Sequence, residues 1–162
     1  SWIIKENMSW DIFRSEYKNG HASLESSDKT KMANVIASSY DKCIKTGFAN
    51  APAAGPLAAG NVKGFEGALI PCFVGFGAVP FSLALDNGLK LYWLGGLVAS
   101  GGSVVVPGVT AAFIEPQGKL NENLDDFIEQ LITSFKTHLA QVSGLQPAAP
   151  SPLPWVGYNV IW

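Results

Sequence analysis

The chain has 162 residues, a length that fits one domain with a single substantial core. Charged residues make up only 15% of the chain and the formal net charge is −2 with no basic block, so the composition does not indicate a nucleic-acid-binding surface. Seventeen Gly and ten Pro indicate many turns and extended connections.

The N-terminal sequence SWIIKENMSW argues against secretion, because Lys5 and Glu6 interrupt the apolar run that a signal peptide needs. Ser1 is the kind of small residue left after removal of an initiator Met, so we expect an intact cytosolic product. Cys43 and Cys72 are the only cysteines, and neither lies in a CxxC or Cys/His cluster. We interpret them as two buried thiols, with a disulfide as the open alternative.

Two helices are predicted in the first third of the chain, over residues 9–18 and 26–46. The second has an apolar face formed by Met32, Val35, Ile36, Tyr40 and Ile44. Residues 48–63, FANAPAAGPLAAGNVK, follow as a Gly/Pro/Ala linker that should form neither a continuous helix nor a strand.

Two long stretches in the middle of the chain carry no charge, Gly67–Leu85 and Leu91–Ile114. Their length alone would permit a transmembrane hairpin. Helix-disrupting residues interrupt both, namely Pro71 and Pro80 in the first and Gly101, Gly102 and Pro107 in the second. Neither flank carries a Lys/Arg cluster that would set an orientation. We therefore favour buried core and subunit interface over membrane insertion.

The expected local structure of this middle region is a kinked buried helix, a turn at Asn87-Gly88 and a helix through LKLYWLGGLVA. An extended stretch should follow, because GGSVVVPG resembles a strand between turns.

The clearest predicted element is a helix over residues 122–143. Its apolar stripe comprises Leu124, Phe127, Ile128, Leu131, Ile132, Phe135, Leu139 and Val142. Asn121 or Asn123 can cap its start, and Gly144 can end it. No further periodicity follows this helix.

Few residues in the sequence could carry chemistry. His21 lies in a predicted polar turn, NGHAS, and His138 lies near the end of the predicted late helix, where a partly exposed imidazole would interact favourably with the helix dipole. Glu66 stands alone, and Asp125 and Asp126 belong to the first turn of that helix. We therefore expect no catalytic, cofactor-binding or metal-binding residues and no enzymatic activity.

The C-terminal residues 147–162, PAAPSPLPWVGYNVIW, combine prolines with large aromatic residues. The prolines favour an extended polyproline II path, and aromatic side chains on such a path are typical interface anchors. The alternative is that both ends of the chain fold back onto its own core. We interpret residues 147–162 as an arm that is buried in a neighbouring subunit, with four candidate partner-binding residues: Trp155, Tyr158, Trp162 and, at the other end of the chain, Trp2.

Several short motifs resemble those of small virion structural proteins from tailed phages and large DNA viruses. They are YWLGG at Tyr92–Gly96, PGV at Pro107–Val109, FKTHLAQVSGL at Phe135–Leu145 and PWVGY at Pro154–Tyr158, together with an N-terminal amphipathic helix and a Gly/Pro-rich linker. The resemblance spans most of the chain and implies a non-enzymatic assembly role. It supplies no catalytic residues.

The expected fold is mainly α, a small helical domain (residues 1–146) with a short extended or β element near residues 103–113 and long ordered arms, of which residues 147–162 are the C-terminal one. The expected function is that of a structural subunit of a virion, as a minor capsid, cement or neck/tail component, assembled in the host cytoplasm. It would act by subunit contacts and arm exchange with copies of itself and other structural subunits, without a cofactor. The alternative function is a small membrane-embedded subunit that uses residues 67–114 as a helical hairpin.

Overall fold

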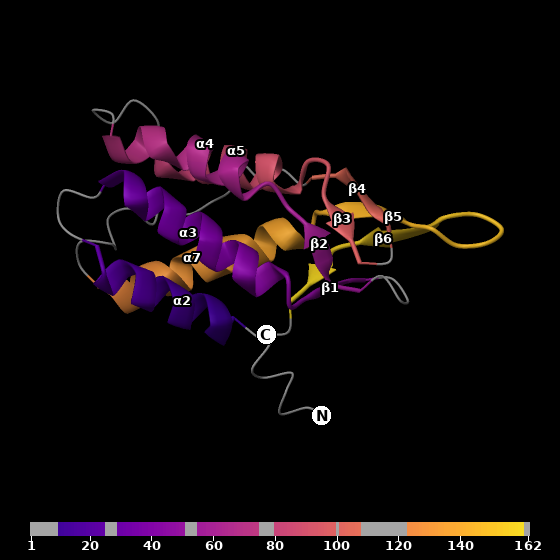
Figure 1. Ribbon diagram of the computed structural model, residues 1–162, viewed down its shortest axis with the longest axis horizontal. Helices are drawn as coiled ribbons and strands as arrows, with labels where there is room; N and C mark the ends of the chain where they lie inside the picture. The colour runs from indigo at the N-terminus through magenta and orange to yellow at the C-terminus, as the bar shows by residue number, and fades with distance from the viewer. Residues whose placement is uncertain are drawn as a thin grey trace.

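The computed structural model describes residues 10–24, 29–50, 55–74, 80–99, 101–107 and 123–160. Within these residues the chain forms five helices and seven short strands. The helices occupy one end of an elongated molecule and the strands the other (Figure 1). This arrangement confirms the mainly α class with a small β element.

The helices are α2 (Asp11–Ala22), α3 (Lys29–Ile44), α4 (Val62–Val74), α5 (Phe81–Trp93) and α7 (Leu124–Leu139). The strands are β1 (Phe48–Ala49), β2 (Leu57–Ala59), β3 (Leu97–Val98), β4 (Ser103–Val106), β5 (Ser143–Gln146), β6 (Leu153–Val156) and β7 (Tyr158–Asn159). In the described part of the chain, no helix combines the length and the apolar character needed to cross a membrane.

Helix α7 confirms the predicted apolar stripe, most of which lies in the core. Asn123 caps its start, because its side-chain oxygen accepts a hydrogen bond from the Asp126 N–H at 3.2 Å. The expectation of a partly exposed His138 is wrong, since this residue is 0% exposed. Position 138 follows Phe135 by three residues and Leu131 by seven, so it lies on the stripe itself.

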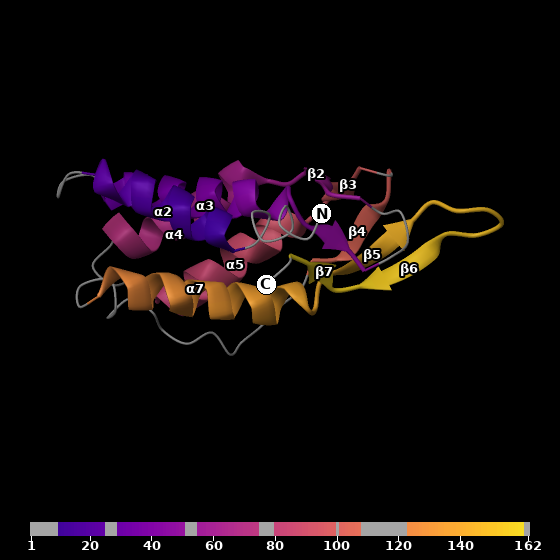
Figure 2. The same cartoon turned by 90° about the horizontal axis from the view of Figure 1, so that it is seen from below.

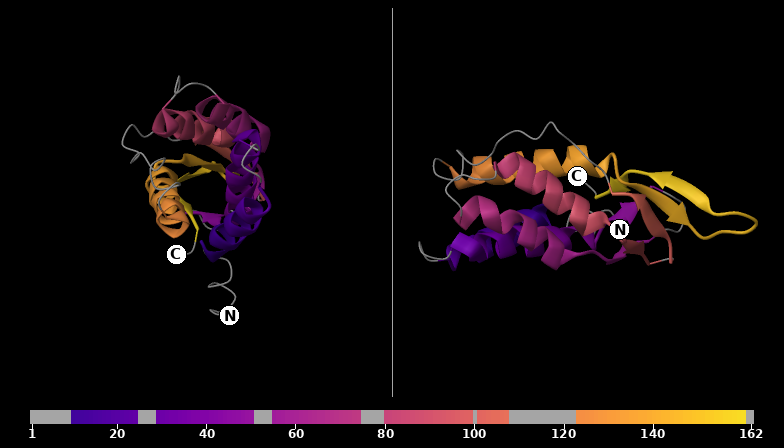
Figure 3. Two further views of the ribbon diagram at one scale, coloured as in Figure 1. Left: turned by 90° about the vertical axis from the view of Figure 1, so that its left-hand side faces the viewer. Right: turned by 90° about the horizontal axis from the view of Figure 1, so that it is seen from above.

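Helices α2, α3, α4 and α5 pack in succession, each against the next along the chain. Seen from the end of the bundle they form a curved layer, and α7 lies opposite them (Figure 3). Aromatic side chains fill the interior between the two. Phe135 of α7 contacts the rings of Tyr40, Phe13 and Trp10, with centroid separations of 4.7, 5.2 and 6.0 Å. The core is therefore largely an aromatic cluster.

Two predicted turns are helical in the structure. Helix α2 continues to Ala22, so His21 lies in its last turn and stacks on Tyr17. Gly88, predicted as part of a turn, lies inside α5. A Cβ at Gly88 would come within 2.5 Å of the Phe65 ring, so the glycine is what lets α4 and α5 approach closely. The predicted helix through LKLYWLGGLVA ends at Trp93, and the chain continues as β3.

The strands form two antiparallel sheets. The larger has the order β2-β3-β4-β5-β6, and the smaller pairs β1 with β7. The prediction that residues 48–63 lack strands is wrong, because β1 and β2 lie within this range and α4 begins at its end. Strands this short leave no recognisable pattern in the sequence. They form because of their pairing partners, and β1 pairs with a segment about a hundred residues further along the chain.

The predicted domain boundary at residue 146 falls inside a hairpin. Strands β5 and β6 pair in register, with Ser143 opposite Val156 and Gln146 opposite Leu153. The segment 153–160 therefore does not extend away from the helical domain but completes both sheets. Cys43 and Cys72 are buried and are not joined in a disulfide, which confirms the interpretation as two buried thiols.

Candidate functional site

One face of the five-stranded sheet is turned away from the core. Successive side chains of a strand point to opposite faces, so the register assigns each residue to one face. Leu57, Val98 and Trp155 lie on the inner face and are buried. We call the opposite side the outer face, formed by Leu97, Ser103, Val105, Val106, Ser143, Leu145, Pro154 and Val156. Val105 lies at the register shift in β4.

The outer face is uncharged and mostly apolar, with Ser103 and Ser143 as its polar residues. Val156 and Val105 are 65% and 58% exposed, and Leu97, Val106 and Leu145 are also exposed. The five strands β2 to β6 contain no Asp, Glu, Lys or Arg. The helical end is different, since ion pairs such as Arg14–Glu129 and Lys18–Asp125 lie on it. A contiguous apolar patch of this kind is typical of a protein interaction site.

The β5–β6 hairpin extends this surface beyond the rest of the molecule (Figures 1 and 2). Its loop, residues 147–152, has the sequence PAAPSP, and every residue of it is exposed. The loop is longer than the two to five residues of most hairpin connections. The hairpin therefore presents an uncharged projection next to the outer face.

The free edge of β6 is poorly suited to pairing with another strand. Gly157 N–H donates to the Val142 carbonyl at 2.6 Å, so by alternation the backbone groups of residues 154 and 156 point away from β5. Pro154 has no N–H to offer, and the Val156 carbonyl accepts a hydrogen bond from Asn50 Nδ2 at 3.1 Å. These are recognised ways of blocking edge-to-edge association.

Trp155 lies on the inner face of the hairpin. It is 2% exposed and stands directly opposite Gly144 on β5. A Cβ at Gly144 would come within 2.5 Å of its Cζ2, so the indole covers the glycine. The ring belongs to this chain's own core in this structure and is not presented on a free arm.

Tyr158 joins three separate segments through one hydroxyl group. Its oxygen accepts a hydrogen bond from Leu57 N–H at 2.6 Å. It donates toward the carbonyls of Ile44 and Gly47, at 3.0 and 2.9 Å. The ring, 1% exposed, packs on Trp93 with centroids 4.9 Å apart. Burial raises the pKa of Tyr158 above its usual range, so the hydroxyl keeps its proton as a donor.

The structure describes two of the four predicted partner-binding residues, Trp155 and Tyr158. Trp155 and Tyr158 are buried in the chain that carries them, so a geometry in which they reach out from this chain is wrong for the described conformation. Trp2 and Trp162 lie outside the described residues.

The residues considered for chemistry are dispersed and form ordinary contacts. Glu66 accepts a hydrogen bond from Asn34 Nδ2 at 2.6 Å and lies 3.8 Å from Lys63 Nζ. Asp125 pairs with Lys18 at 2.8 Å. Among the described residues, no group of three His, Cys, Asp or Glu side chains could hold a metal ion.

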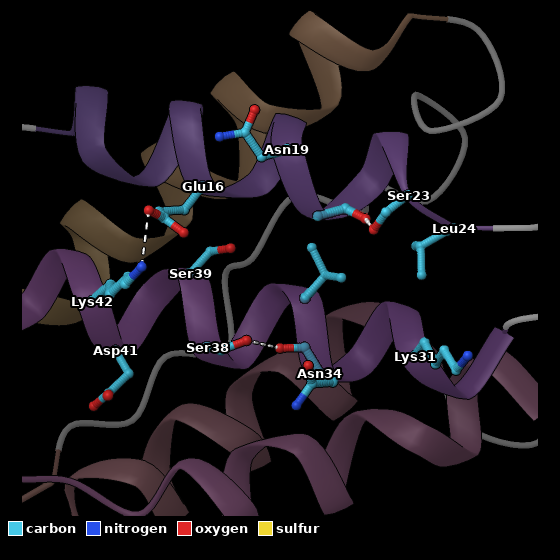
Figure 4. Close-up of a pocket in the computed structure, with 12 residues that line it drawn as sticks. Glu16, Asn19, Ser23, Leu24, Lys31, Asn34, Ser38, Ser39, Asp41 and Lys42 are labelled. Atoms are coloured by element: carbon cyan, nitrogen blue, oxygen red, sulfur yellow. Dashed lines mark hydrogen bonds and ion pairs between the residues drawn. The ribbon is translucent and has the colours of Figure 1, made fainter.

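A groove of about 690 Å³ runs between α2 and α3 (Figure 4). Its wall includes the ion pair between Lys42 Nζ and Glu16 Oε1, at 3.1 Å. Ser23 and Ser38 turn their hydroxyls back onto the carbonyls of Gly20 and Asn34. These polar groups satisfy one another across and along the helices, so the groove is the weaker candidate site.

No known family, curated sequence or solved structure matches the chain. The outer face is therefore assigned from the residues of this chain alone. Sequence reasoning missed it because strand pairing decides which side of β4, β5 and β6 is exposed. A signal was nonetheless present, since no Asp, Glu, Lys or Arg follows Lys136.

Proposed function

We propose that this protein is a structural subunit of a large assembly and acts through subunit contacts without catalytic turnover. The outer face is the observation that carries this proposal. A water-exposed apolar face without a charge is unfavourable in an isolated molecule, and each Å² of it removed from water contributes roughly 25 cal/mol.

The projecting hairpin and the blocked edge of β6 support the same function. Pro154 and the hydrogen bond from Asn50 to the Val156 carbonyl disfavour uncontrolled strand addition. An exposed apolar face beside a protected edge fits specific association better than aggregation. Exchange of the C-terminal segment between subunits is part of the proposal, with Trp155 and Tyr158 as its anchors.

The proposed setting is a virion, where the protein would be a minor capsid, cement or neck/tail component. This finer assignment is supported by the resemblance of the short motifs, including YWLGG at Tyr92–Gly96 and PWVGY at Pro154–Tyr158. Assembly would take place in the host cytoplasm with copies of the chain and other structural subunits.

Fractionation of the material in which the protein is made tests the function. We expect the protein to sediment with large particles and to remain with them after a high-salt wash. A tagged Val156→Glu variant should stay in the light fraction, because it places a charge on the outer face. Leu83→Glu is the matched control, since Leu83 is 50% exposed at the start of α5, in the helical part of the molecule. Wild-type protein found only in the light fraction would contradict the proposal.

A further inference from the structure

We infer that the outer face closes on the outer face of a second copy of this chain, in a two-fold dimer that also uses the β5–β6 hairpin. This inference rests on the proposed function, because it names the partner that covers the face. It commits to a homodimer, and the other possible occupants are outcomes of the test below.

Charge distribution is the first reason for a second copy. None of the strands of the large sheet carries a charged residue, whereas ion pairs such as Arg14–Glu129, Lys18–Asp125 and Lys42–Glu16 lie on the described helices. An uncharged face gains no Coulomb attraction from an acidic or basic partner. A copy of the chain offers an equally apolar surface. A pair joined at the sheets also keeps the negatively charged chains' helical ends apart.

The protected edges are the second reason, because they restrict association to the faces. On the β6 edge, Pro154 lacks a donor and Asn50 binds the Val156 carbonyl. On the opposite edge, β2 is only three residues long and its Leu57 N–H donates to Tyr158 Oη. Face-to-face packing of two sheets, about 10 Å apart, uses no edge groups. An isologous contact of this kind ends at two copies.

The size of the face explains why the hairpin is needed. Five strands about 4.8 Å apart span only roughly 19 Å. A stable interface buries about 800 Å² on each partner, more than so small a face supplies alone. The hairpin already carries Leu145, Pro154 and Val156 of the outer face, and it adds its exposed, uncharged loop, residues 147–152. We therefore place the hairpin of each copy along the outer face of the other.

The test is the oligomeric state of the purified protein, measured by sedimentation equilibrium with light scattering. We expect a concentration-dependent monomer–dimer equilibrium for the wild type. Val156→Glu and Leu145→Glu should each raise the dimer dissociation constant at least about 100-fold, because the carboxylate would be buried without a partner. Leu83→Glu should leave the dissociation constant unchanged. Circular dichroism and melting curves check that every variant keeps its fold.

A second variant tests the hairpin separately. Replacing residues 147–152 by Asn-Gly, the preferred two-residue hairpin turn, keeps β5 and β6 paired and shortens the projection. We expect it to weaken the dimer by about tenfold or more, in line with the loss of a peripheral part of the interface.

Three outcomes overturn the inference, and they are distinguishable from failure of the proposed function. A wild type that stays monomeric at its solubility limit excludes the homodimer. If Val156→Glu still blocks entry into particles in that case, the face binds a different subunit and the proposed function stands. A dimer that is unaffected by Val156→Glu and Leu145→Glu uses another surface. A wild type that dimerises only with vesicles present would assign the face to lipid.

Discussion

Gly144 and Trp155 are cross-strand partners, and the indole ring of Trp155 occupies the space that a side chain at position 144 would need. On its other side, the same Cβ would collide with the backbone oxygen of Ser103 on β4. Strands β4, β5 and β6 therefore pack closely at Gly144, where the lack of a side chain is required. Residues from the C-terminal segment are thus part of the domain's core.

The first prediction concerns Gly144→Ala. The added methyl group must displace both a ring and a backbone strand, which typically costs about 1–3 kcal/mol. We expect a lower melting temperature and a lower urea midpoint, with near-ultraviolet circular dichroism reporting the change around Trp155. Gly67→Ala is the matched control. Apart from the neighbouring backbone of α4 itself, no atom lies within 4 Å of a Cβ at Gly67, so this change should be neutral or slightly stabilising. Equal effects of both changes would show that packing at Gly144 is not tight.

The second prediction concerns Tyr158→Phe. Loss of the hydroxyl removes the acceptor for Leu57 N–H and the donor to the carbonyls of Ile44 and Gly47. Buried backbone groups left without partners should lower the free energy of unfolding by about 1–3 kcal/mol. Urea denaturation measures it. An unchanged unfolding free energy would mean that water replaces the hydroxyl.

The structure also reverses an expectation that follows from a free arm. Such an arm could be removed without loss of stability, but deletion of residues 147–162 here removes β6, β7 and the buried rings of Trp155 and Tyr158. We expect the truncated chain to be unfolded, as judged by its circular dichroism and proteolysis. A truncated chain with a wild-type melting temperature would instead support the interpretation of residues 147–162 as a free arm.

The third prediction concerns acid. Arg14 binds Glu129 through two hydrogen bonds, of 2.6 and 3.1 Å, and these lower the pKa of Glu129. A depressed folded-state pKa contributes stability above the unfolded value of about 4.3, and this stability is lost as the pH falls through the folded value. The gain should stay below about 1 kcal/mol, because both side chains are partly exposed. Glu129→Gln should abolish this part of the pH dependence in melting curves, and an identical pH profile would contradict it.

The fourth prediction concerns the Cys43 thiol. Burial raises its pKa to about 12, so almost no thiolate forms near pH 8. We expect iodoacetamide to leave Cys43 unmodified in the folded protein and to alkylate it in urea. Mass spectrometry of peptides locates the label. Rapid alkylation of the folded protein would show that α3 opens readily around this residue.

The fifth prediction tests exchange of the C-terminal segment. Ser143 and Val156 are opposite each other in the β5–β6 hairpin, in a pair that alternation makes non-hydrogen-bonded, where Cα atoms are about 4.5 Å apart. Cysteines at both positions should therefore form a disulfide. In unassembled protein we expect the bond within one chain, and in assembled protein between chains. Non-reducing electrophoresis distinguishes the two, and bonds within single chains in both samples would exclude exchange.

The helices were predictable because local patterns determine them. The stripe of α7 follows directly from the spacing of Phe127, Leu131 and Phe135, and the structure confirms it. The prediction of a turn at Gly88 was wrong, because a glycine is needed there to leave room for the Phe65 ring inside the helix packing. A glycine that ends a helix and one that admits a neighbouring helix look the same in sequence.

The candidate site was predictable only in its composition. The lack of charge after Lys136 is plain from the sequence and points to the C-terminal segment. The sequence alone does not show which side of that segment is buried and which is exposed, because this depends on the strand register. Trp155 is buried and Val156 is exposed only because β6 pairs with β5 as it does, and a shift of one residue would reverse them.

The uncharged character of the outer face also has a thermal consequence. Association through apolar surface is driven near room temperature mainly by the entropy of released water, and it carries a negative heat-capacity change. Contacts made by Val156 and its neighbours should therefore weaken on cooling, while ionic strength has little influence on them. An assembly held together in this way would partly dissociate at about 0 °C and reassociate on warming.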